Sequence, residues 1–204
     1  MNNDAMASHY INLFKKHGDS HSSVQYSSKE SQYKRFEELI KIGNIENSTI
    51  LDYGCGLGDL YSYLREKKFD GCKYTGVDLV PDFVKACTDK YHMCRFYTPN
   101  DWPTQTLYEY AFVSGVFNNI RDDAKSFWME TIKYLFSRTT KGLAFNMMSK
   151  YVDYEADDLF YVWPEDVFNY CKTLTPYITI NNAYSIDKDK PPFEFAVYIY
   201  HSGN

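Results

Sequence analysis

The stretch ILDYGCGLG, residues 50–58, decides how the rest of the sequence is interpreted. Its first half is an apolar run that ends at Asp52, as expected for a buried strand reaching the edge of a sheet. Its second half has a glycine at every second position, which permits a tight turn and lets the backbone approach a ligand without an intervening Cβ. Because Leu60, Tyr61 and Leu64 then begin a helical pattern, the stretch is interpreted as strand, glycine loop and helix.

Short apolar runs alternate with amphipathic stretches from this motif onward. The alternation predicts an α/β fold with a Rossmann-like, seven-stranded, mostly parallel sheet and helices on both faces. The expected strands are residues 49–53, 73–78, 93–97, 109–114, 141–147, 176–183 and 193–200, and the expected helices are 58–68, 81–91, 122–138 and 164–173. A polar loop, 181–192, separates the last two strands, so the C-terminal strand is expected to run antiparallel.

The sequence before the motif is polar. Residues 1–28 are predicted to be a mobile segment with one short helix near 11–16. Ser28 can cap a following helix that closes at Gly43. We expect one domain over residues 1–204, in which 1–48 form a lid segment with its helix and 49–204 form the cofactor-binding core.

Composition narrows the class of partner. A net charge of −5 provides no global positive field for phosphate backbones, so nucleic acid is not expected as a partner. The five cysteines form no C-x-x-C pair, which suits a reducing cytoplasm. There is no basic-then-apolar start and no apolar run of roughly 18 residues, so a cytoplasmic protein without membrane contact is expected, as a monomer or homodimer.

Two cofactors compete for the glycine loop. The dinucleotide fingerprint is G-x-G-x-x-G, whereas here the third glycine, Gly58, follows the second by two positions. The carboxylate of Asp52 would repel a pyrophosphate but attract the ammonium or sulfonium group of S-adenosylmethionine. Asp78, at the end of the second strand, can accept hydrogen bonds from both ribose hydroxyls of either cofactor. Spacing and charge therefore favour S-adenosylmethionine over NAD.

The segment 52–58 resembles the first motif of class I S-adenosylmethionine-dependent methyltransferases, and Asp78 resembles their second-strand acid. The resemblance implies that S-adenosylmethionine is the cofactor and S-adenosyl-L-homocysteine the product. It also implies that the loop after the third strand meets the adenine. Asp101 would then accept from the adenine amino group, and Trp102 or Leu79 would lie against the ring.

The same resemblance places the end of the fourth strand beside the methionine part and the acceptor. Residues 114–117 there are Ser-Gly-Val-Phe, and not the Asp- or Asn-Pro-Pro-aromatic sequence of enzymes that methylate base amino groups. Base methylation is therefore disfavoured. The helix after Ser28 resembles one that folds over the donor in small bacterial members, so Tyr26, Gln32 and Arg35 are expected to help cover the methionine part.

The predicted cofactor-binding residues come from these loops and from that helix. They are Asp52, Gly54, Cys55, Gly56, Gly58, Asp78, Leu79, Asn100, Asp101, Trp102, Ser114, Gly115, Phe117 and Gln32. For Trp102, an anchor packed on the core is an equally valid interpretation.

The catalytic candidates are fewer, because a sulfonium methyl is already electrophilic. The protein mainly has to align the reactants and accept a proton where the acceptor requires it. His17 and His21 are candidate bases in the lid segment, although each also fits a surface position, and Tyr26 is a third catalytic candidate. The histidines and cysteines show no metal-ligand spacing, so no metal site is expected.

The leading functional hypothesis is a methyltransferase that acts on an oxygen or nitrogen of a small molecule, such as a sugar, a surface-glycan precursor or a natural-product intermediate. Residues 149–161, acidic and aromatic, are where the acceptor would bind, unless they are simply a surface loop. Further candidates for the pocket wall are Asn118, Tyr151, Tyr154 and Glu194. The alternatives are a non-catalytic module that binds S-adenosylmethionine and, less favoured, an NAD-dependent oxidoreductase.

Overall fold

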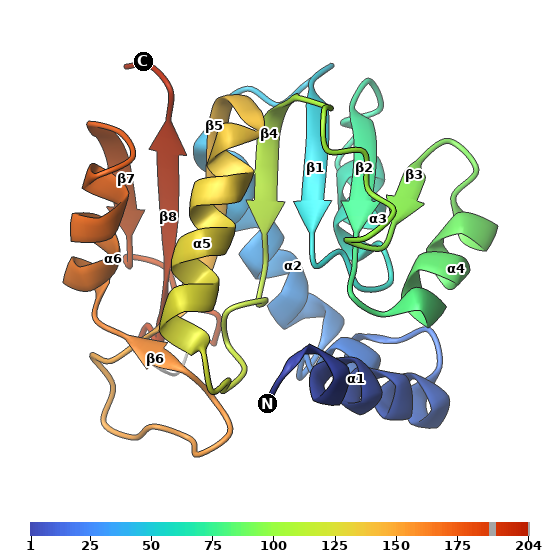
Figure 1. Cartoon of the computed structure of the whole chain (residues 1–204), viewed down its shortest axis with the longest axis horizontal. Coiled ribbons are helices and arrows are strands. Elements are labelled where there is room, and N and C mark those ends of the chain that lie inside the picture. Colours follow the sequence, from blue (N-terminus) through green and yellow to red (C-terminus); the bar gives the residue numbers. More distant parts are fainter. Residues whose placement is uncertain (188–190, 204) are drawn as a thin grey trace.

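Eight strands form one mixed sheet within residues 1–187 and 191–203, the part of the chain that this computed structural model describes (Figure 1). They are β1 (Thr49–Tyr53), β2 (Lys73–Val77), β3 (Arg95–Tyr97), β4 (Tyr108–Val113), β5 (Thr139–Ser149), β6 (Tyr161–Val162), β7 (Tyr177–Asn181) and β8 (Glu194–Tyr200). β1 to β5 are parallel, and β8 lies antiparallel between β5 and β7. The predicted α/β fold is confirmed. The strand beyond the predicted seven is β6, whose two residues are too few to show a pattern.

The strand order is β3-β2-β1-β4-β5-β8-β7, with β6 paired to the end of β5. The chain therefore builds outward from β1 to β3 and then returns to place β4 on the other side of β1. Ligands of open α/β sheets bind at such a reversal, beyond the carboxyl ends of the strands. Asp52 lies at this position, since it pairs with Gly76 of β2 and with Phe112 of β4.

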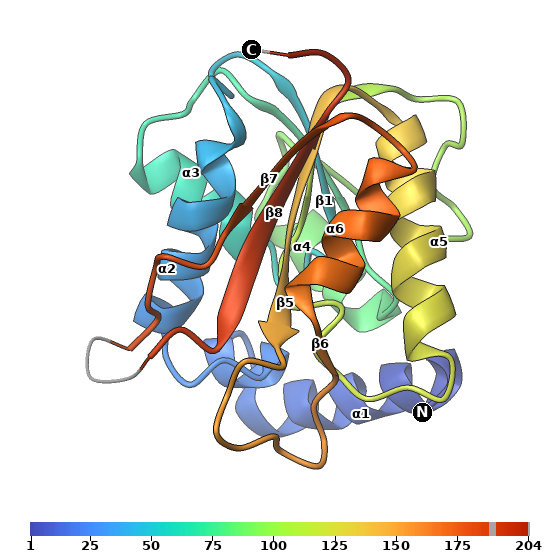
Figure 2. The same ribbon diagram turned by 90° about the vertical axis from the view of Figure 1, so that its left-hand side faces the viewer.

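Helices cover both faces of the sheet. They are α1 (Asn3–His17), α2 (Lys29–Leu39), α3 (Asp59–Glu66), α4 (Pro81–Lys90), α5 (Ala124–Ser137) and α6 (Pro164–Lys172), with short 3-10 helices η1 (His21–Val24) and η2 (Ile40–Ile42). Figure 2 shows α5 and α6 on one face and α2 and α3 on the other. β4 is buried on both sides, because Ala111 and Val113 join the first core while Tyr110 and Phe112 join the second. This double burial explains the continuous apolar runs in the sequence.

The two N-terminal helices differ in how well they were predicted. Ser28 caps α2 with a reciprocal capping box, as expected, and η2 carries the chain on to Gly43. The short helix predicted near 11–16 is wrong in extent, because α1 spans Asn3–His17. Its first turn is capped by the side chain of Asn2, which accepts from the backbone N–H of Ala5 at 2.9 Å.

α1 lies beneath the carboxyl ends of β1, β2 and β4 (Figure 1), and packs against Phe83 of α4 through Tyr10 and Phe14. Of the predicted polar loop 181–192, residues 188–190 lie outside the described residues. No helix in the described ranges is long and apolar enough to cross a membrane.

Candidate functional site

A cavity of about 970 Å³ lies between α1 and the carboxyl ends of the central strands. Its inner wall consists of the loops after β1, β2, β3 and β4, and its outer wall includes residues of α1, α2 and the segment after η1. The sheet therefore presents its topological reversal to a cavity that α1 partly covers.

The glycine loop forms part of this wall in a conformation that only glycine adopts easily. Gly54 and Gly56 have φ values of +78° and +53°. A Cβ on Gly54 would lie 2.1 Å from a Val116 methyl carbon, and one on Gly56 would lie 2.8 Å from a Val24 methyl carbon. The backbone of the loop therefore reaches the cavity where no side chain would fit.

Asp78 lines the cavity beside this loop. Its two carboxylate oxygens accept the backbone N–H groups of Gly56 at 2.8 Å and Val80 at 2.9 Å. Burial raises the pKa of Asp78 to about 6, although both backbone hydrogen bonds lower it. Each oxygen keeps a free lone pair, so the side chain can accept two further donors, as two ribose hydroxyls would provide.

Asp52 is a second buried carboxylate in the cavity wall. It accepts a hydrogen bond from the Tyr74 hydroxyl, and burial raises its pKa to about 7, with the charges of Asp78 and Asp59 adding to the effect. Within residues 1–187 and 191–203, neither Asp52 nor Asp78 forms an ion pair. A cationic ligand would stabilise the charged form of both.

The loop after β3 divides into residues that face the cavity and one that does not. Leu79, Asn100 and Asp101 line the cavity, and the Thr98 hydroxyl donates to the Asp101 carboxylate at 2.6 Å. Trp102 is only 4% exposed, and its ring nitrogen donates to the Tyr108 hydroxyl at 3.0 Å. Trp102 is therefore a core anchor, which is one of the two places expected for it, and it does not line the cavity where the adenine ring was expected.

Two other predicted residues also lie outside the cavity wall. Phe117 is buried in the core, where its ring meets Phe127 and Phe145 edge to face. Gly58 is the N-cap of α3, and a Cβ there would meet the ring of Tyr91. The remaining predicted residues line the cavity together: Asp52, Gly54, Cys55, Gly56, Asp78, Leu79, Asn100, Asp101, Ser114, Gly115 and Gln32.

Of the three catalytic candidates, Tyr26 lines the cavity, whereas His17 and His21 do not. Tyr26 lines the cavity, with its hydroxyl 3.1 Å from Ser114 Oγ. Burial raises the pKa of Tyr26 against the opposing charge of Arg35, so its phenol stays protonated and is a poor base. His17 and His21 do not line the cavity, because the segment that follows α1 presents Val24 and Gln25 to it instead. The proposed base role of these histidines has no support in their position.

A buried ion pair supports the wall formed by α2. The Arg35 guanidinium contacts Glu194 of β8 at 2.7 Å, and its central carbon lies 5.3 Å from the centre of the Tyr26 ring. Glu194 also accepts from the Asn146 amide at 3.2 Å and from the Tyr184 hydroxyl at 2.9 Å. Arg35 lines the cavity, whereas Glu194 lies behind it.

The outer half of the cavity was predicted in part, through Asn118 and through Asp158 and Leu159 of the segment 149–161. Its other wall residues were not predicted: Met6 and Tyr10 of α1, Asn119 and Arg121 after β4, Phe127 of α5 and Met148 of β5. Tyr151 and Tyr154 are 59% and 75% exposed and lie outside it. The local signal for α1 was present, since Met6, Tyr10 and Phe14 recur at helical spacing.

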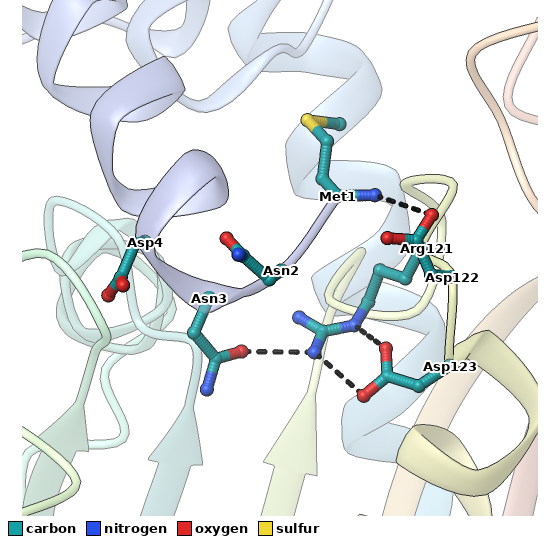
Figure 3. Close-up of a pocket in the computed structure, with 7 residues that line it drawn as sticks. All are labelled: Met1, Asn2, Asn3, Asp4, Arg121, Asp122 and Asp123. Atoms are coloured by element: carbon teal, nitrogen blue, oxygen red, sulfur yellow. Dashed lines mark hydrogen bonds and ion pairs between the residues drawn. The ribbon is translucent and has the colours of Figure 1, made fainter.

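The loop after β4 holds α1 across this half of the cavity. Arg121 donates to the side chain of Asn3 at 3.0 Å and to that of Asp123 at 3.0 Å, as Figure 3 shows. The Asn119 amide donates to the Tyr10 hydroxyl at 2.7 Å. The Arg121–Asn3 and Asn119–Tyr10 contacts join residues more than 100 positions apart, so no local sequence pattern predicts them.

In the described part of the chain, no group of three or more His, Cys, Asp or Glu side chains is placed to hold a metal ion.

Comparison with known proteins is consistent with this geometry. A sequence profile of the methyltransferase domain matches residues 28–174. Magnesium protoporphyrin IX methyltransferase from Synechocystis, solved with S-adenosylmethionine, has a TM-score of 0.68 at 14% identity over 99% of this chain and 98% of that chain. An S-adenosylmethionine-dependent methyltransferase from Clostridium acetobutylicum has a TM-score of 0.60 at 14% identity, over 98% and 99% of the two chains.

A third similar structure is that of the plantazolicin methyltransferase BamL in complex with a triazolic desmethylPZN analogue and S-adenosylhomocysteine. Its TM-score is 0.64 at 10% identity, over 97% of both chains. No curated protein sequence matches the chain. At these identities the solved structures establish the shared fold.

Proposed function

This chain belongs to the methyltransferase-domain family, within the class I group that uses S-adenosylmethionine, and from that premise we propose that it methylates an oxygen or nitrogen atom of a small molecule. The observation that carries the proposal is that the glycine-loop backbone and two buried carboxylates, neither in an ion pair within the described residues, line one cavity.

The residues present fit S-adenosylmethionine. Asp78 offers free lone pairs for the ribose hydroxyls, and Asp101 offers a carboxylate for the adenine amino group. Asp52 supplies negative charge without a cation of its own, which suits a ligand that carries a sulfonium and an ammonium. A pyrophosphate at the glycine loop would instead meet the buried carboxylate of Asp52, so the NAD alternative is disfavoured by charge.

When bound, S-adenosylmethionine supplies an electrophilic methyl group, so that the acceptor forms a bond to carbon as the carbon–sulfur bond breaks and a proton leaves the acceptor. The protein's own part is to align and enclose the reactants. α1 closes the outer side of the cavity, and the Arg35–Glu194 pair supports the wall beside Tyr26. Because Tyr26 stays protonated, it serves as a hydrogen-bond donor in this wall.

A small acceptor is favoured over a polymer because α1 covers the cavity. The net charge of −5 and the Ser-Gly-Val-Phe sequence at 114–117 also weigh against a nucleic-acid substrate. We extend the proposal to a single domain over residues 1–204 that works in the cytoplasm as a monomer or homodimer.

Isothermal titration calorimetry with S-adenosylhomocysteine and with NAD tests the cofactor. Binding of S-adenosylhomocysteine without binding of NAD is expected, and the reverse would refute the proposal. Transfer of a radiolabelled methyl group from S-adenosylmethionine to a small-molecule extract of the source organism tests the reaction. Tight cofactor binding without any transfer would favour the non-catalytic binding module instead.

A further inference from the structure

From the proposed function we assign one part of the cavity wall to the methyl donor and another to the acceptor, and call them the donor half and the acceptor half. The donor half is the part lined by Asp52, the glycine loop and Asp78. The acceptor half is the part lined by α1, by the loop after β4 and by the carboxyl end of β5 with the segment after it. Its apolar wall includes Met6 of α1, Phe127 of α5, Met148 of β5 and Leu159 before β6. This wall suits an apolar scaffold, and the two methionines can adapt to its shape.

Asn118 lines the cavity with a buried polar atom that has no partner. Its side-chain oxygen, Oδ1, is buried without a hydrogen bond. The other buried side-chain atoms without a partner in the described residues belong to His9, Trp128 and Arg138, none of which lines the cavity. The neighbouring amide of Asn119 is satisfied by the Tyr10 hydroxyl at 2.7 Å. A buried acceptor without a donor is unfavourable, so Asn118 Oδ1 is where a ligand donor would be stabilised.

Asn118 lies between the donor half and the acceptor half of the cavity. Its backbone N–H donates to the Gly115 carbonyl at 3.2 Å, in the turn that follows β4. A Cβ on Gly115 would lie 2.8 Å from the Tyr26 hydroxyl and 3.9 Å from Asn118 Nδ2. The Asn118 amide and the Tyr26 hydroxyl therefore flank the end of β4, where the two halves of the cavity meet.

The charges that line the cavity argue against an anionic acceptor. Arg35 and Arg121 are the basic residues of the wall in the described ranges, and both are engaged, Arg35 by Glu194 and Arg121 by Asp123. The acceptor half instead carries two exposed carboxylates, Asp4 and Asp158. A carboxylate or phosphate acceptor would thus be enclosed without a free counter-charge.

From these observations we propose that Asn118 is the positioning residue for the methyl acceptor, and that the acceptor is a neutral hydroxyl or amine on an apolar scaffold. This inference rests on the proposed function. The reacting oxygen or nitrogen donates its hydrogen to Asn118 Oδ1 and keeps a lone pair free. In the transfer the reacting oxygen or nitrogen gains the methyl group and releases its hydrogen to water as a proton. The sulfonium of the methyl donor becomes a neutral thioether.

Binding of three ring compounds to the protein saturated with S-adenosylhomocysteine tests the inference. Phenol and aniline present a neutral O–H or N–H, and benzoate presents a carboxylate on the same ring. Ligand-observed NMR is expected to show binding of phenol, aniline or both, with benzoate about tenfold weaker or more. Tighter binding of phenol would indicate an oxygen acceptor, and tighter binding of aniline a nitrogen acceptor. Benzoate binding as tightly as phenol, or no binding by any probe, would overturn the inference.

Two Asn→Leu variants separate the role of Asn118 from a structural one. Asn118→Leu is expected to weaken phenol or aniline binding by about fivefold or more, since it removes one hydrogen bond, and to change S-adenosylhomocysteine affinity less than about twofold. Asn12→Leu, exposed on α1 outside the cavity wall, is the matched control and is expected to change neither. Unchanged probe binding in Asn118→Leu would refute the assignment.

The stability of the transferred label to alkali gives an independent readout. Methyl esters release methanol in alkali, whereas methyl ethers and N-methyl groups do not. Alkali-stable label in the acceptor is expected. Volatile label would overturn this inference while leaving the proposed function intact, and failure to bind S-adenosylhomocysteine would count against the proposed function itself.

Discussion

Replacing Asp78 with Asn tests the central residue of the donor half with almost no change of shape. The native carboxylate accepts two backbone N–H groups, from Gly56 at 2.8 Å and from Val80 at 2.9 Å. An Asn side chain can accept only one of them, because its second polar atom is a donor. The substitution therefore removes both the buried charge and one acceptor that faces the cavity.

The expected changes in folding stability nearly cancel. Burial raises the pKa of Asp78 from 3.8 to about 6, so at pH 7.5 the charged side chain lowers the free energy of unfolding by about 3 kcal/mol. Removing the charge relieves that cost, while one backbone N–H left unpaired costs about 1–3 kcal/mol. The net change is expected to stay within about 2 kcal/mol.

The affinity for the cofactor is expected to change much more. Loss of one hydrogen bond between a ribose hydroxyl and a charged carboxylate costs about 1.5–3 kcal/mol, which corresponds to a Kd for S-adenosylhomocysteine about 10–150 times higher. Calorimetry at pH 7.5 measures the Kd, and urea unfolding of the same samples measures stability. Asp82→Asn, exposed in the first turn of α4, is the matched control for loss of one negative charge. A Kd for Asp78→Asn within threefold of the native value would refute the reasoning.

Three further predictions concern stability. Gly54→Ala places a Cβ 2.1 Å from a neighbouring side chain on a backbone with a φ of +78°. It should lower the free energy of unfolding, measured in urea, by about 2–4 kcal/mol. Gly18→Ala is the control, because Gly18 has a φ of +64° but open space around it, and should lower that free energy by only about 1 kcal/mol. Burial raises the pKa of Asp52 from 3.8 to about 7, so the folded state binds this proton more tightly and stability is lost as pH rises from about 4 to 7. Asp52→Asn should therefore gain up to about 4 kcal/mol relative to the native protein across that window, and a constant difference would contradict the assignment. Glu194→Gln leaves the buried guanidinium of Arg35 without its counter-charge and should cost about 3 kcal/mol in urea unfolding; a loss below about 1 kcal/mol would mean that water reaches the pair.

The cofactor half of the site was predictable because its signals are local. A buried strand, alternating glycines and a helix follow one another within residues 49–66, and the backbone rules for each act over a few residues. Asp78 could be placed because the end of one parallel strand lies beside the end of the next.

Side-chain direction in the loops was not predictable in the same way. Trp102 and Phe117 lie within a few residues of the cavity wall, yet both rings point into the core. Whether a loop aromatic packs inward depends on partners such as Tyr108 and Phe145, which come from other strands. The burial of aromatic area decides the direction, and that area is created only when the strands assemble.

The sequence by itself determined the fold class and the place of the glycine loop between a strand and a helix, because periodicity and backbone preference are properties of short segments. Only the tertiary structure decided what faces the acceptor. In the tertiary structure α1 lies across the strand ends, and His17 and His21 lie outside the cavity wall. The tertiary structure also left Asn118 Oδ1 buried without a partner. These outcomes depend on contacts between segments more than 100 residues apart, such as Tyr10 with Asn119, and no local pattern encodes such a contact.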